Sequence, residues 1–131
     1  MAEFAKLHVW RKAHALALKV HNVATGIRGS NYASLRSQMI RAAMSIPANI
    51  VEGRGQKSGP EFVRFLRYAL TSSSELEYHL IVARDFRAIS LGDFTRLHDQ
   101  LIEVRKMLHG LIRRVSANEV KNPQRLSDVP M

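Results

Sequence analysis

An apolar residue recurs near the end of the chain at alternating spacings of three and four. The members of this series are Phe94, Leu97, Leu101, Val104, Leu108, Leu111 and Val115. Such a seven-residue repeat places every member on one side of an α-helix, and that side must be buried against other helices. Ser90, with Asp93 three residues later, is typical of a helix start. The series predicts a helix over about residues 91–117 and a fold built from packed helices.

Three earlier segments carry apolar stripes of the same kind, over about residues 9–27, 31–53 and 60–88. Pro47 lies inside the second and removes an amide donor, which predicts a kink or short break near residues 44–46. No segment shows a strand pattern or an internal repeat. Connections of about three to six residues make consecutive helices antiparallel. The predicted fold is therefore all-α, an antiparallel up-down-up-down four-helix bundle.

The length of 131 residues suits a single domain, which we predict to span residues 1–118. The apolar period is lost near Lys121, where Pro123 and Pro130 appear, so residues 119–131 are expected to form a flexible C-terminal tail. The chain has no cysteine, and no apolar stretch is long enough for a signal peptide or a membrane span. These features predict a cytoplasmic protein that is not held in a membrane.

Positive charge is concentrated in the first half of the chain. The whole chain has a formal charge of +9, and its first 60 residues contain nine basic side chains and two acidic ones. Such an excess favours RNA or DNA through counterion release, although a basic surface can also serve solubility alone. The candidate nucleic-acid-binding residues are Arg11, Lys12, Lys19, Arg28, Arg36, Arg54 and Lys57.

Four polar residues of the second predicted helix, Arg41, Ser45, Asn49 and Glu52, are spaced to share one side of that helix or its edge. An arginine, a serine, an asparagine and a glutamate so grouped can bind a ligand. They can equally form a hydrogen-bonded network that supports the backbone loosened by Pro47 and a neighbouring helix. The sequence leaves both interpretations open.

The patterns that would indicate an enzyme are incomplete. Residues 53–59 resemble a phosphate-binding loop, but they lack its glycine spacing and follow a predicted helix instead of a strand. No glutamate is followed by histidine at the Glu-x-x-His spacing of di-iron bundles, and Glu75 with His79 is a lone pair one helical turn apart. We therefore predict no catalytic residue, no metal, no cofactor and no enzymatic activity.

Aromatic residues offer a second way to contact nucleic acid, because they can stack on bases. The candidates are Trp10, Tyr32, Tyr68 and Tyr78. Trp10 stands at the start of an apolar stripe, which favours an anchor within the bundle or a contact between subunits. The cationic residues are the better candidates for contacting phosphate.

Three segments carry a resemblance to a known family: residues 7–13, 38–53 and 72–76. The second contains Arg-Ala-Ala-x-Ser-Ile-Pro-Ala-Asn-Ile-x-Glu-Gly over residues 41–53. From about Leu7 to Arg114, the chain closely resembles the bacterial four helix bundle family, whose members are also known as products of intervening sequences in large-subunit rRNA genes. Leu70 and Thr71 depart from the family pattern, where many members carry Arg and Gly.

The resemblance implies a four-helix protomer in a ring, most simply a homopentamer. A structurally similar relative, the accessory variability protein of diversity-generating retroelements, is a basic pentameric barrel that binds nucleic acid and a reverse transcriptase. Charge and resemblance together predict a non-enzymatic, oligomeric nucleic-acid-binding or scaffold protein that contacts the phosphate backbone. The alternative is a structural or protein-interaction module with no nucleic-acid role.

Overall fold

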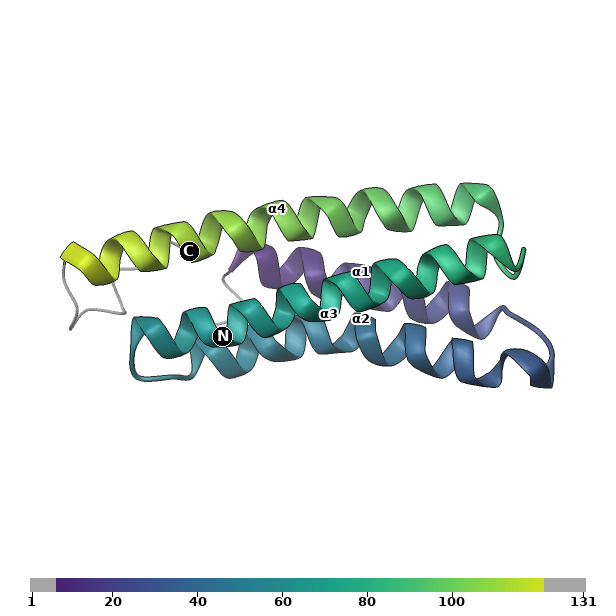
Figure 1. Ribbon diagram of the computed structural model, residues 1–131, viewed down its shortest axis with the longest axis horizontal. Helices are drawn as coiled ribbons and strands as arrows, with labels where there is room; N and C mark the ends of the chain where they lie inside the picture. Colours follow the sequence, from purple (N-terminus) through teal and green to yellow (C-terminus); the bar gives the residue numbers. More distant parts are fainter. Residues whose placement is uncertain (1–6, 122–131) are drawn as a thin grey trace.

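The computed structural model describes residues 7–121, and the side chains of residues 7–118. It contains helices α1 (His8–Thr25), α2 (Ala33–Arg54), α3 (Gly59–Asp85) and α4 (Leu91–Lys121), and a short 3₁₀ turn, η2 (Ser30–Tyr32). The helices lie side by side along the long axis (Figure 1). The α1–α2 and α3–α4 connections lie at one end of the bundle and the α2–α3 connection lies at the other. The predicted all-α, antiparallel four-helix bundle is confirmed.

Each helix packs against two others, since α1 contacts α2, α2 contacts α3, α3 contacts α4, and α4 contacts α1. The predicted stripes face inward. Six of the seven residues in the repeat of α4 are buried, and the seventh, Phe94, is half-buried beneath Arg84, whose guanidinium carbon lies 4.6 Å from the ring centre. None of the described helices combines the length and apolar character needed to cross a membrane.

Of the kink or short break predicted near Pro47, the break does not occur, because α2 is a continuous helix from Ala33 to Arg54. Pro47 is buried, and Ile46 and Ile50 beside it are fully buried. The burial of these three side chains stabilises the helix more than the loss of one backbone hydrogen bond at Pro47 destabilises it. The side-chain amide nitrogen Nδ2 of Asn49 also donates a hydrogen bond to the backbone carbonyl oxygen of Ser45 at 2.8 Å.

The helix ends differ from the predicted ones by a few residues. The second predicted helix starts too early, because residues 30–32 form η2 after Gly29, whose φ is 108°. Ser58 caps α3 and Ser90 caps α4, each accepting a hydrogen bond from the backbone amide three residues on, and the helix start predicted at Ser90 is thereby confirmed. Helix α4 continues to Lys121, four residues past its predicted end, and the remainder of the predicted tail lies outside the described residues.

Candidate nucleic-acid interface

A line of adjoining hollows follows the surface between α1 and α4, and we call it the α1/α4 groove. Its lining residues on α1 are His8, Val9, Lys12, Ala15, Lys19, Asn22 and Val23. Its lining residues on α4 are Asp93, Arg96, Leu97, Gln100, Glu103, Val104, Lys106, Met107, Gly110 and Arg114. The groove exists because α1 and α4, the first and last of the described helices, are neighbours in the bundle.

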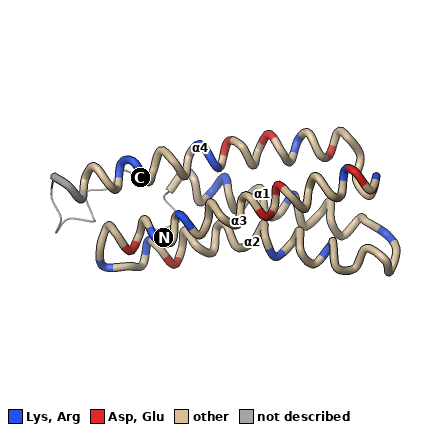
Figure 2. Tube along the Cα trace, in the orientation of Figure 1, with Lys and Arg blue, Asp and Glu red and all other residues tan. Residues whose placement is uncertain are grey.

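The groove is predominantly cationic. Its charged residues are Lys12, Lys19, Arg96, Lys106 and Arg114 against the two carboxylates Asp93 and Glu103. Figure 2 shows that basic positions occur along the length of the bundle, with acidic positions between them on α4. The groove is thus a surface where cations from both ends of the sequence meet.

The two carboxylates pair with two of the cations. The Lys12 ammonium lies 3.5 Å from the Glu103 carboxylate, and Arg96 pairs with Asp93 one turn before it on α4. The side chains of Lys12 and Glu103 are each 53% exposed, so water and salt screen their attraction. In the described part of the chain, Lys19, Lys106 and Arg114 form no ion pair. The groove therefore presents positive charge that the described residues do not neutralise.

Five of the seven predicted cations are exposed, but the structure does not gather them into one site. Lys12 and Lys19 line the α1/α4 groove, and Arg11 is exposed on α1. Arg28 is in the α1–α2 connection and Lys57 is in the α2–α3 connection, so these two lie at opposite ends of the bundle.

The other two predicted cations contact the protein itself. The Arg36 guanidinium donates to the carbonyl oxygens of Ile27 and Gly29, both at 2.9 Å, and so fixes the α1–α2 connection. Arg54 is only 8% exposed, and its guanidinium carbon lies 5.8 Å from the ring centre of Phe62. Neither arginine belongs to the exposed basic surface. Both contacts depend on how two helices meet, which a count of charges does not show.

The polar group predicted on α2 is only partly a network. The hydroxyl oxygens of Ser45 and Ser72 lie 2.7 Å apart, and the Asn49 amide donates to the Ser45 hydroxyl at 3.1 Å. Arg41 and Glu52 are exposed, and neither side chain makes a hydrogen bond or ion pair within the described residues. Ser45 and Asn49 thus connect α2 to α3 through Ser72, while Arg41 and Glu52 lie outside this network.

Sequence reasoning missed a polar cluster between α3 and α4. The Glu77 carboxylate lies 2.8 Å from the His98 ring nitrogen Nε2 and accepts a hydrogen bond from Arg105 at 3.0 Å. Arg105 also donates to the Ser73 hydroxyl at 3.3 Å. The hydrogen bonds with His98 and Arg105 lower the pKa of the Glu77 carboxyl. The sequence contained one indication of this cluster. His98 and Arg105 each follow a residue of the α4 repeat, and their separation of seven residues places them on the same side of the helix.

The aromatic candidates are dispersed over the bundle. Trp10 packs against the core and stacks on His14 with a ring separation of 5.0 Å, while Tyr32 packs against the core near Phe86. Tyr68 is exposed and accepts a hydrogen bond from Arg64. The ring centres of Tyr78 and His79 lie 5.9 Å apart. Among the described residues, no three His, Cys, Asp or Glu side chains are grouped to hold a metal ion.

The sequence from residue 5 to residue 110 matches the family described as 23S rRNA-intervening sequence protein. The chain belongs to this family. The 23S rRNA-intervening sequence protein family is the one that the motif over residues 41–53 indicated, and that motif forms most of α2. The family match covers α1, α2, α3 and the greater part of α4, and so includes most of the α1/α4 groove.

A solved structure from Bacteroides thetaiotaomicron, described as a protein with unknown function from the S23 ribosomal protein family, has a similar fold. The two structures superpose with a TM-score of 0.75 at 24% sequence identity, covering 80% of this chain and 98% of that chain. At this identity the likeness concerns the fold alone. Among curated proteins, none matches this chain.

Proposed function

We propose that this member of the 23S rRNA-intervening sequence protein family is a non-enzymatic oligomer that binds the phosphate backbone of nucleic acid in the cytoplasm. The observation that carries the proposal is the α1/α4 groove, where Lys19, Lys106 and Arg114 have no carboxylate partner among the described residues. Unpaired cations along a groove favour a polyanion, because phosphate contacts release condensed counterions. Such contacts carry little base specificity.

The experiment is binding of the purified protein to duplex DNA and to structured RNA over a salt series. The informative variant is Lys12→Glu with Lys19→Glu, which reverses two charges of the groove. The matched control is Arg28→Glu with Lys57→Glu, which makes the same change in net charge at the two ends of the bundle. For duplex DNA, each lost phosphate contact flattens the slope of log affinity against log salt by about 0.9.

If the groove binds nucleic acid, Lys12→Glu with Lys19→Glu should lower the affinity and flatten its salt dependence. Arg28→Glu with Lys57→Glu should retain most of the affinity and of the salt dependence. An equal loss in both variants assigns binding to net charge and contradicts a specific groove. If the wild-type protein binds neither nucleic acid even at low salt, the proposal fails as a whole.

Self-association is supported by the exposed side of α2. Arg41, Met44, Ala48 and Glu52 lie on it, and Met44 is 57% exposed. An apolar centre between a cation and a carboxylate is suited to contact another protein surface. The mass of the wild-type protein and of Met44→Lys in the binding buffers tests this part. An oligomer that becomes a monomer on the substitution supports it, and a monomeric wild type contradicts it.

The alternative proposal is a structural or protein-interaction module without a nucleic-acid role. It is favoured by the large apolar side chains that the bundle leaves exposed. These are Leu18, Met44, Tyr68, Tyr78, Phe86 and Leu91. An oligomer that binds neither nucleic acid at any salt concentration supports this alternative over the first proposal.

A further inference from the structure

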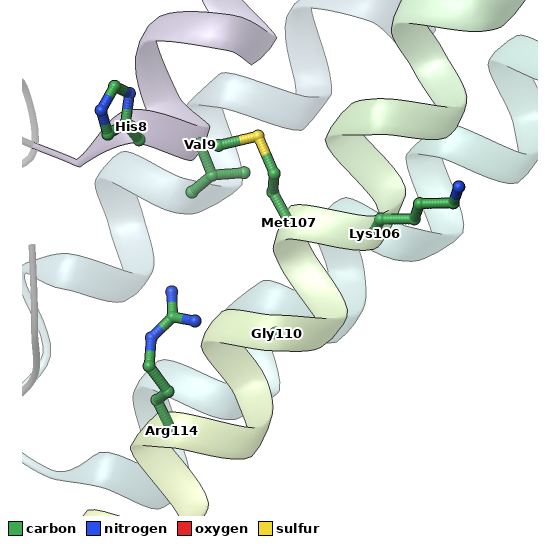
Figure 3. A pocket seen from close by; sticks show the side chains of 6 residues that line it. All are labelled: His8, Val9, Lys106, Met107, Gly110 and Arg114. Carbon is green, nitrogen blue, oxygen red and sulfur yellow. The ribbon is translucent and has the colours of Figure 1, made fainter.

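One hollow of the α1/α4 groove has a chemistry of its own. It lies between the first turn of α1 and the second half of α4, and it has a volume of about 400 Å³. Small-molecule sites occupy about 300–1,000 Å³. In Figure 3, His8 and Arg114 lie on the same side of Met107, while Lys106 extends from the other side. The hollow is thus of a size for a small ligand and has positively charged groups at its edge.

The floor of the hollow is apolar. Val9 is buried, Met107 is half-buried, and Gly110 has no side chain. None of the described residues that line this hollow carries a carboxylate. Among the described residues, no hydrogen bond or ion pair engages the side chains of His8 or Arg114. The hollow therefore suits a ligand that combines a flat ring with a negatively charged group.

Gly110 keeps the floor of the hollow free of a side chain. A glycine inside a helix destabilises it relative to alanine, so its presence within α4 needs a reason. A methyl group at this position would lie 3.4 Å from the Arg114 guanidinium and 3.8 Å from that of Arg113, both mobile ends of long side chains. Packing within the described chain therefore does not require the glycine. What an alanine would change is the space beside Arg114, on the floor of the hollow.

We propose that this hollow binds a single nucleotide unit. The base lies on Met107 and Gly110, and the phosphate accepts hydrogen bonds from Arg114 and His8. Contacts of apolar atoms with the face of a base involve no hydrogen bonds to its edge, so they do not select one base over another. A free nucleotide and a nucleotide within a strand share this chemistry. The strand as the source rests on the proposed function, because the hollow is one end of the α1/α4 groove.

The test uses the full-length protein, with adenosine 5′-monophosphate, inorganic phosphate and an RNA hexanucleotide as probes, and NMR titration or calorimetry as the readout. The variants are Gly110→Ala and Arg114→Gln. The matched control is Gly92→Ala on the same helix, because a methyl there also lies 3.4 Å from an arginine guanidinium, that of Arg96, outside this hollow.

Gly110→Ala is expected to lower the affinity for adenosine monophosphate about tenfold while raising Tm by about 3–6 °C, since alanine stabilises a helix interior. Arg114→Gln is expected to lower the affinity about tenfold through loss of a charge-assisted contact. Gly92→Ala should leave the affinity unchanged. A gain in stability together with a loss of binding cannot result from misfolding.

The inference is overturned if adenosine monophosphate does not bind, if its affinity is the same in Gly110→Ala and the wild type, or if inorganic phosphate binds equally well. Long RNA that binds through Lys12 and Lys19 while the mononucleotide does not bind would retain the proposed function and reject this site. Mononucleotide binding without salt-dependent RNA binding would retain this site and reject the proposed function. A hexanucleotide that binds more tightly than the mononucleotide, in a way that depends on Gly110, identifies the strand as the source.

Discussion

The hydroxyl oxygens of Ser45 and Ser72 lie 2.7 Å apart and connect α2 to α3. Asn49, one turn along α2, donates to the same Ser45 hydroxyl, so Ser45 can give its own proton to Ser72. Both serines are largely shielded from water, which makes each a costly group to leave without a partner. The chain Asn49, Ser45, Ser72 thus fixes how the two helices face each other.

Replacing Ser72 by alanine is expected to lower the free energy of unfolding by about 1 kcal/mol, because Ser45 loses its partner across the interface. The double variant Ser45→Ala with Ser72→Ala should cost less than the sum of the two single changes, because both remove one contact. Urea denaturation measures the free energy of unfolding of each variant, provided that the m-value is unchanged. Ser74→Ala on the exposed side of α3 is the control, and strict additivity of the pair would contradict a direct bond.

Gly53 at the end of α2 leaves no room for a side chain. An added Cβ atom would lie 2.9 Å from Phe62 Cδ1 and 2.9 Å from Phe65 Cβ. Gly53→Ala is therefore expected to destabilise the protein by about 1–3 kcal/mol, the usual cost of forcing extra atoms into a packed interface. Gly55→Ala, whose nearest neighbour would be 3.6 Å away, should change little. Thermal unfolding compares the two, and equal stability of the variants would disprove the clash.

Glu77 is predicted to make stability depend on pH. Hydrogen bonds with His98 and Arg105 lower its pKa in the folded protein below the ordinary value of 4.5. A carboxyl with a lowered folded pKa stabilises the protein fully above its unfolded pKa and loses this effect as pH falls through the folded pKa. Glu77→Gln should thus cost about 1 kcal/mol at pH 7 and progressively less below about pH 4.5. Urea denaturation at several pH values measures the difference in the free energy of unfolding between Glu77→Gln and the wild type.

The control for this titration is Glu75→Gln on the same helix. Glu75 is exposed and has no hydrogen-bonding partner among the described residues, so its variant should differ little from the wild type at any pH. If the difference in stability between Glu77→Gln and the wild type does not become smaller in acid, Glu77 stabilises the protein through packing instead of charge.

Glu103 is expected to weaken polyanion binding in the wild-type protein. Its carboxylate pairs with Lys12 at 3.5 Å inside the α1/α4 groove. Glu103→Gln removes a negative charge and releases Lys12, so the affinity for duplex DNA should rise about three- to tenfold and the salt slope should steepen by up to about 0.9. Asp85→Asn makes the same change in charge outside the groove. Equal gains in the two variants would show that net charge alone controls binding.

The fold was predictable because its signals are local. The seven-residue repeat from Phe94 to Val115 and the caps at Ser58 and Ser90 depend on residues within one or two helical turns of each other. The absence of a break at Pro47 has the opposite origin. Whether a proline interrupts a helix depends on the packing around it, and the burial of Ile46 and Ile50 comes from other helices.

The candidate site was harder to predict, because it is formed by residues far apart in sequence. Counting charges by position directed attention to the first half of the chain and correctly included Lys12 and Lys19 among the exposed cations. Lys106 and Arg114 were missed because α4 becomes a neighbour of α1 only in the folded bundle. Arg54 looked like a surface cation, and only the tertiary structure shows it beneath the surface beside Phe62.

The pairing of α1 with α4 also has a consequence for folding kinetics. The other three neighbouring pairs are consecutive helices joined by short connections, so they form through local contacts at a small cost in loop entropy. Only α1 and α4 must meet across the length of the chain, and this step closes the bundle. If nucleic acid binds in the α1/α4 groove as proposed, it contacts both helices at once. We then expect it to oppose the separation of α1 from α4, and so to slow unfolding as well as shift its equilibrium.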